Sequence, residues 1–236
     1  EPLSDDAVET FLRRWCEALY TDRPATAERH YRELLDALHA RADVRRIARN
    51  PVMLTALAVV HWNERRLPEQ RADLYESIIT WLSRSREQRE GRATADRTVA
   101  LLAELALAMQ SHPLGRQVQV PKRWGAEAIA PELDPGEPTR HTVQRAERFL
   151  DEEEVDSGII VGVGKQVRYR HLTFQEYLAA RAVASRLDDE QRRILLGDPK
   201  RLYDSEWREV VLLLGGILHE QGAAKVDGLF RAVLED

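Results

Sequence analysis

Apolar residues recur every three or four positions along most of this chain, and they switch to alternation in one short stretch only. Three- and four-residue spacing places apolar side chains on one face of an α-helix, whereas alternation is typical of a half-buried strand. The pattern predicts a mainly α fold that contains one small β-hairpin. We expect helices over residues 3–20, 26–40, 43–50, 51–63, 67–90, 96–112, 122–133, 139–154, 173–187, 188–196, 206–220 and 222–235.

The dipeptide Asn50-Pro51 predicts a sharp helix boundary in the first part of the chain. Proline disfavours the α conformation in the residue before it, so the helix over 43–50 should end there. Asn50 can then cap a new helix that has Pro51 as its first residue. The segment 51–63 is apolar almost all round, and we therefore expect this helix to be buried.

The alternating stretch predicts two strands, 159–163 and 166–171, joined by a turn at Gly164-Lys165. His171 would end the second strand on the same face as the apolar positions, since side chains two residues apart share a face. On this pattern alone, a lone histidine at a strand end is more often a structural residue than a ligand.

Thr173 and Glu176 have the spacing of a capping box, which predicts that the next helix begins with Thr173 as its N-cap. Leu172 and Tyr177 would form the accompanying hydrophobic staple. His171 would then lie beside a helix N-terminus, where partial positive charge and free N–H groups favour an anion.

Charge, cysteine content and the longest apolar run limit the kinds of partner and compartment that we expect for this chain. The formal net charge of the 236-residue chain is −5, which argues against a dedicated nucleic-acid binder. The lone cysteine, Cys16, cannot form an internal disulfide, so we expect a reducing cytoplasm. The longest apolar run, 210–218, is too short to cross a bilayer, and we expect no membrane partner. Because the chain begins at Glu1 without a methionine, we also expect it to be part of a longer polypeptide.

We expect neither catalytic residues nor a metal site in this chain. It lacks the G-x-x-x-x-G-K-[ST] phosphate loop, and the short match GVGKQ (162–166) is better explained as the hairpin turn. No serine has the G-x-S-x-G setting of a hydrolase. The acidic run 151–156 lacks a calcium-loop pattern and is expected to be a solvated helix end.

Three stretches resemble the NACHT-type NTPases of the STAND class. RHLTFQEYLAARAVA (170–184) is similar to the family's H-x-[ST]-F-Q-E-[FY] segment, and ARNPVMLTAL with LPEQRADLY (within 48–82) is similar to its N-P helix and the start of the next domain. LSDDAVETFLRRWC (3–16) more weakly resembles the helix that closes the ATPase core. The three stretches occur in the family's order and cover most of the chain to about residue 190.

The resemblance implies an architecture of three parts: a NACHT-associated helical domain (1–66), a winged-helix domain with one small β-hairpin (67–172), and the start of a second helical domain (173–236). It also implies that a P-loop ATPase core belongs to the same polypeptide, holds Mg²⁺, and is absent from this chain. This chain alone should neither hydrolyse ATP nor bind nucleotide tightly.

The resemblance further implies a nucleotide switch. In such relatives ADP is clamped between the core and the accessory domains, and exchange for ATP releases them and allows self-oligomerisation. By matching position, Pro51 would pack against the base and sugar, and His171 would contact the β-phosphate of ADP. The expected role is conformational control in bacterial defence or signalling.

A DNA-binding winged helix is the alternative from another class. Its recognition helix would be 139–150, which offers Arg140, His141, Arg145 and Arg148. The acidic run that follows would repel phosphates, and the overall charge is unfavourable. A purely structural helical scaffold is a third possibility, under which His171 would affect only stability.

Overall fold

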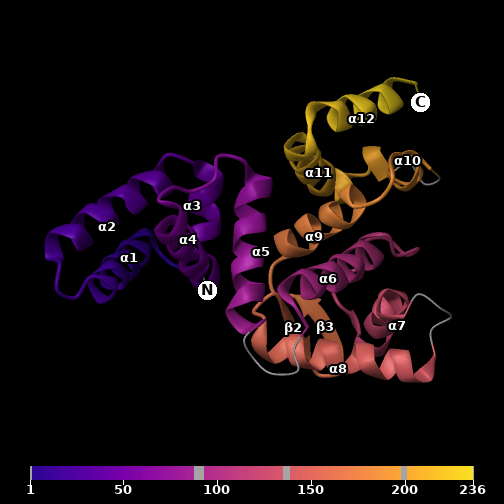
Figure 1. The fold of residues 1–236 in the computed structure, drawn as a ribbon, viewed down its shortest axis with the longest axis horizontal. Helices are drawn as coiled ribbons and strands as arrows, with labels where there is room; N and C mark the ends of the chain where they lie inside the picture. The colour runs from indigo at the N-terminus through magenta and orange to yellow at the C-terminus, as the bar shows by residue number, and fades with distance from the viewer. Residues whose placement is uncertain (1, 88–92, 135–138, 198–200, 236) are drawn as a thin grey trace. The chain divides into compact units, whose positions relative to one another are not determined.

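The structure is a computed structural model that describes residues 2–87, 93–134, 139–197 and 201–235 (Figure 1). The described residues form twelve α-helices and one small three-stranded antiparallel sheet, so the expected mainly α fold is confirmed. The chain divides into two compact units, an N-terminal unit, Glu1–Glu69, and a C-terminal unit, Gln70–Asp236. The expected further division near residue 172 stays a prediction.

Four helices with one shared core make up the N-terminal unit. Their fully buried leucines come from the apolar faces that the sequence predicts, with Leu12 and Leu34 both at 0% exposure. Leu54 and Leu57, also at 0%, come from the helix that is apolar almost all round. The helices are α1 (Asp5–Leu19), α2 (Pro24–His39), α3 (Ala42–Ala48) and α4 (Pro51–Glu64).

Polar side chains fix where α1 and α4 begin. The Ser4 hydroxyl accepts a hydrogen bond from the N–H of Ala7 at 3.2 Å. The Asn50 side chain accepts from the N–H groups of Val52 and Met53 at 3.0 and 3.2 Å. Both caps satisfy N–H groups that have no partner inside their helix, and the predicted Asn50-Pro51 boundary is confirmed.

The C-terminal unit is built around α9, which packs against α6 on one side and α11 on the other. Most of α9 is buried, including Phe174 and Leu178 at 0% exposure. The helices are α5 (Arg71–Glu87), α6 (Ala95–Gln110), α7 (Lys122–Leu133), α8 (Arg140–Asp156), α9 (Leu172–Ala184), α10 (Asp188–Leu196), α11 (Arg208–Gln221) and α12 (Ala223–Glu235), with 3-10 turns η1 (Arg201–Tyr203) and η2 (Ser205–Trp207).

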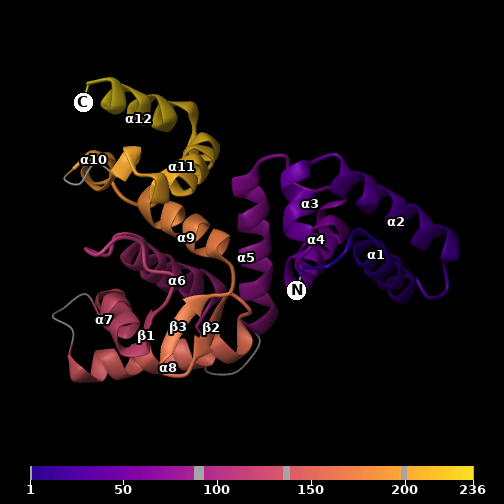
Figure 2. The same cartoon turned by 180° about the vertical axis from the view of Figure 1, so that it is seen from behind.

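The small sheet has the strand order β1-β3-β2 and lies beside α7 and α8 (Figure 2). The predicted hairpin is confirmed, with a turn in which Gly164 adopts a positive φ of 64°. The third strand was not predicted, because two residues are too few to show alternation. The strands are β1 (Val120–Pro121), β2 (Ile160–Val163) and β3 (Gln166–Tyr169).

The predicted capping box at the start of α9 is wrong. The helix begins at Leu172 with His171 as its N-cap, two residues before the predicted N-cap Thr173, and the N–H of Phe174 donates to the His171 carbonyl at 3.0 Å. Glu176 does not reach back to cap the helix, because its carboxylate is buried and accepts from Arg116 at 3.1 Å. The predicted staple also fails, since Leu172 is 40% exposed.

Candidate functional site

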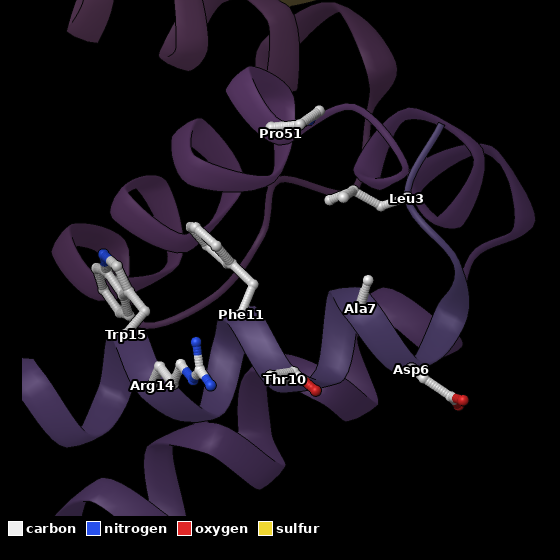
Figure 3. A pocket seen from close by; sticks show the side chains of 8 residues that line it. All are labelled: Leu3, Asp6, Ala7, Thr10, Phe11, Arg14, Trp15 and Pro51. Carbon is white, nitrogen blue, oxygen red and sulfur yellow. The ribbon is translucent and has the colours of Figure 1, made fainter. Parts of the chain in front are cut away.

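Pro51 lies at the edge of a cavity of about 580 Å³ in the N-terminal unit (Figure 3). It is the exposed first residue of α4, and the opposite wall is one face of α1 together with the segment that precedes it. The lining residues are Leu3, Asp6, Ala7, Thr10, Phe11, Arg14, Trp15 and Pro51.

Helical spacing explains the apolar wall. Ala7, Phe11 and Trp15 are four residues apart, so their side chains follow one another along the same face of α1. All three are half-buried, and Figure 3 shows the Phe11 side chain rising from α1 into the space between Trp15 and Pro51. Two aromatic rings and a proline therefore face one opening.

A backbone hydrogen bond joins the two segments that form the cavity. The N–H of Leu3 donates to the carbonyl of Arg49 at 2.7 Å, directly before the Asn50 cap. Arg49 also forms an ion pair with Asp5 at 3.0 Å, although both side chains are more than half exposed and such a pair contributes little. The backbone bond therefore sets the position of Leu3 relative to the start of α4.

The polar side chains of the cavity belong to Asp6, Thr10 and Arg14. All three are exposed, and Figure 3 shows the Asp6 carboxylate turned away from the aromatic rings. A flat ring can stack on Phe11, Trp15 or Pro51, and the Arg14 guanidinium can pair with an anionic group. The volume lies in the range of small-molecule sites.

His171 lies in the C-terminal unit, at the junction of β3 and α9. Its ring packs edge-to-face on Phe174, with centroids 5.3 Å apart. Its Nε2 atom is buried and has no hydrogen-bond partner among the described residues. Burial, followed by the charge of Arg170, lowers the pKa of His171. The ring is therefore neutral at pH 7 and keeps an unused polar atom, which is uncommon in a folded interior.

The predicted alternation along β3 is confirmed. Val167 and Tyr169 are buried on the side that continues to His171, while Arg168 and Arg170 are exposed. The Tyr169 hydroxyl donates to the carbonyl of Leu102 in α6, which fixes the end of the strand. His171 and Pro51 belong to different units.

A partly buried polar network around the start of α9 was not predicted. Arg116 donates to Glu176 through its guanidinium and to the Glu206 carboxylate through its backbone N–H, at 3.1 and 2.9 Å. Gln175 donates to the carbonyl of Gln117 at 3.0 Å. These partners are 58 to 90 residues apart in sequence, so helical spacing gave no signal for them. The network fixes α9 immediately after His171.

A second cavity, of about 540 Å³, lies in the C-terminal unit between α5, α9 and α11. Glu76 lines it and accepts hydrogen bonds from Tyr177 and Arg181. Burial alone would raise the pKa of Glu76, but these hydrogen bonds outweigh burial and lower it. Glu76 therefore stays ionised and paired, and this cavity has no unsatisfied carboxylate at that position.

The described helices include none that is both long and apolar enough to cross a membrane. In the same residues, no group of three or more histidine, cysteine, aspartate or glutamate side chains is arranged to hold a metal ion. Searches of protein-family models, curated proteins and solved structures gave no match to this chain.

Proposed function

We propose that this chain is the regulatory part of a NACHT-type NTPase of the STAND class. It clamps ADP against a P-loop ATPase core of the same polypeptide and changes conformation when ATP replaces ADP. One observation carries the proposal: the stretch 3–16, which resembles the family, lines a cavity together with Pro51 from the second such stretch, 48–82. This chain contributes no catalytic residue, and Mg²⁺ would be held by the core.

The arrangement of the C-terminal unit supports a winged-helix domain within it. Helices α6, α7 and α8 precede the β2–β3 hairpin, and β1 lies between α6 and α7. The second hairpin strand, β3, pairs with both β1 and β2. Three helices followed by such a small sheet are the order that a winged helix requires.

His171 is the group that would distinguish ADP from ATP. A neutral imidazole can donate one N–H to a β-phosphate oxygen, and the N-terminus of α9 adds positive potential. A γ-phosphate would displace this contact, so the two nucleotides would bind the closed state with different affinity. A hydrogen bond to a charged group contributes roughly 1.5–3 kcal/mol, which corresponds to about tenfold to a hundredfold in the closed-to-open ratio.

The test uses the longer protein with its ATPase core. It is purified, denatured, and the released nucleotide is identified by chromatography, for wild type, His171→Ala and the control His39→Ala, which removes an exposed histidine at the end of α2. We expect near-stoichiometric ADP from wild type and the control, and at least tenfold less from His171→Ala. Equal amounts of ADP from all three proteins would show that His171 takes no part in the switch. No nucleotide from any of them would refute the switch itself.

Release of the clamp would also permit self-oligomerisation of the longer protein. The proposed role is in bacterial defence or signalling.

One observation keeps the DNA-binding alternative open. Arg140, His141, Arg145 and Arg148 are all exposed on α8, where a recognition helix would present them. Lys122 opposes part of the acidic end of α8 through ion pairs with Asp151 and Glu154, both at 2.6 Å. Tight, salt-sensitive binding of duplex DNA that Arg145→Ala weakens would favour this alternative.

A further inference from the structure

Two histidines face each other in the interior of the N-terminal unit. His30 on α2 and His61 on α4 are 2% and 3% exposed, and His30 Nε2 lies 3.0 Å from His61 Nδ1. Their rings are stacked with centroids 5.1 Å apart. In such a bond one ring N–H donates to the lone pair of the other ring, so one of the two facing nitrogens must carry no hydrogen.

The pair lies behind one wall of the cavity beside Pro51. Trp15, which lines that cavity, packs edge-to-face on His30 with ring centroids 5.7 Å apart. Tyr20, at the end of α1, contacts the same ring at 5.6 Å. His30 is therefore held between α1 and α4, and through it Trp15 is supported by His61.

The surroundings of the pair disfavour an added proton. His30 Nδ1 and the Tyr20 hydroxyl are buried with no hydrogen-bond partner among the described residues. A proton on His30 Nδ1 would place a charged N–H in the interior without an acceptor. The negative charge of Glu33 on α2 would partly stabilise a protonated ring, and the positive charge of Arg65, just after α4, would destabilise it. Among the described residues, these are the charged groups that act on both rings.

Proton uptake by the pair has two stages. The first proton can leave the shared hydrogen bond intact, but it puts a charge between α2 and α4. A second proton gives both facing nitrogens a hydrogen, and the hydrogen bond between the rings is then lost.

Burial, followed by the charge of the neighbouring His30, lowers the pKa of His61 to about 4. Burial, followed by Arg65, lowers the pKa of His30.

We propose that the His30–His61 pair is a proton-sensitive joint of the N-terminal unit, which holds α2 against α4 while both rings are neutral and releases the Trp15 wall of the cavity when it takes up a proton. This response to pH does not depend on which ligand the cavity binds, so it is independent of the proposed nucleotide switch.

The direction of the pH effect follows from linkage. Both histidines have folded-state pKa values below the ordinary value of 6.5, so the stability from the neutral pair is complete above that pH and is lost as the pH falls below it. The part that belongs to His61 is lost down to about pH 4. For His61 alone, the equilibrium constant for unfolding should rise about 30-fold between pH 8 and pH 5.

The test is urea unfolding of the intact chain at pH 8 and pH 5, followed by the emission of Trp15 taken as the difference from the Trp15→Phe variant. His61→Gln keeps an amide that can hydrogen-bond His30 but cannot be protonated, and His39→Gln is the control. We expect wild type and the control to lose stability at pH 5 and His61→Gln to lose at least tenfold less in the unfolding constant. An equal loss in all three would overturn the proposal.

If His61→Gln does not fold, a second measurement on the wild-type chain tests whether the His30–His61 pair responds to protons. Ring signals of ¹³C-labelled histidine in the wild-type chain should show His61 still neutral at pH 5.5 and His30 titrating below its ordinary pKa of 6.5. Quenching of the Trp15 emission by acrylamide should rise as the pH falls below that value. Titration of either ring near pH 6.5, or unchanged quenching down to pH 4, would overturn the proposal.

Discussion

Glu176 is a carboxylate held almost entirely out of water, at 5% exposure, on the helix that follows His171. Burial raises its pKa to about 6, although the charge of Arg116 acts in the opposite direction. A raised carboxyl pKa favours the folded state at low pH. The stabilising contribution is present below the ordinary value of 4.5 and is lost as the pH rises through about 6.

Replacing this carboxyl should therefore change the pH dependence of stability. Glu176→Gln keeps an acceptor for Arg116 but removes the titration, so wild type should lose about 2 kcal/mol relative to the variant between pH 4 and pH 7.5. Urea unfolding across this range measures the difference. Glu127→Gln, on an exposed surface of α7, is the control, and a Glu176→Gln curve parallel to wild type would contradict the interpretation.

Two adjacent glycines on α11 are placed very differently. A Cβ added at Gly215 would meet nothing within 4 Å, whereas one added at Gly216 would lie 2.9 Å from the Cβ of Ala72 on α5. Replacing either glycine by alanine would lower the conformational entropy that the chain loses when the helix forms. Gly216 thus permits the close approach of α11 to α5, and Gly215 has no such role.

The matched pair of variants separates helix propensity from packing. Gly215→Ala should stabilise the chain by roughly 0.5–1 kcal/mol. Gly216→Ala should destabilise it by about 1–3 kcal/mol, because helix α11 must move away from α5. Thermal unfolding of both variants beside wild type measures the difference, and two variants of equal stability would show that the approach of α11 to α5 is not close.

Patterns in short stretches of sequence predicted the helices and strands that are determined by residues close together in the chain. Periodicity located the helices, Asn50-Pro51 located the start of α4, and alternation located the hairpin. The strand β1 is too short to show alternation, and both this strand and the true start of α9 also depend on partners far away in sequence. β1 is defined by pairing with β3, and Glu176 is withdrawn from capping by Arg116.

The residues of the candidate site were also predicted only in part. The resemblance to a family singled out Pro51 and His171, while Phe11 and Trp15 looked like ordinary core residues of an amphipathic helix. Both rings are only half-buried and line a cavity. Helical spacing identifies the face to which a residue belongs, but it does not show whether another element covers that face.

At the scale of the whole molecule, each unit has a core of its own. Leu54 in α4 and Leu178 in α9 are both at 0% exposure, one in each core. Leu54→Ala and Leu178→Ala should each cost about 2–5 kcal/mol, since both leave a cavity. Hydrogen exchange followed by mass spectrometry should show faster exchange mainly in the unit that carries the substitution. Equal acceleration in both units would mean that they unfold together.

The bond between Leu3 and Arg49 has a consequence for the order of folding. The cavity beside Pro51 is lined by segments more than forty residues apart, and helices α2 and α3 lie between these segments in the sequence. Non-local contacts of this kind form late, since loop closure costs entropy before they stabilise the chain. A molecule that fills the cavity therefore binds only the completed N-terminal unit, and by mass action its concentration would set how much of that unit stays folded.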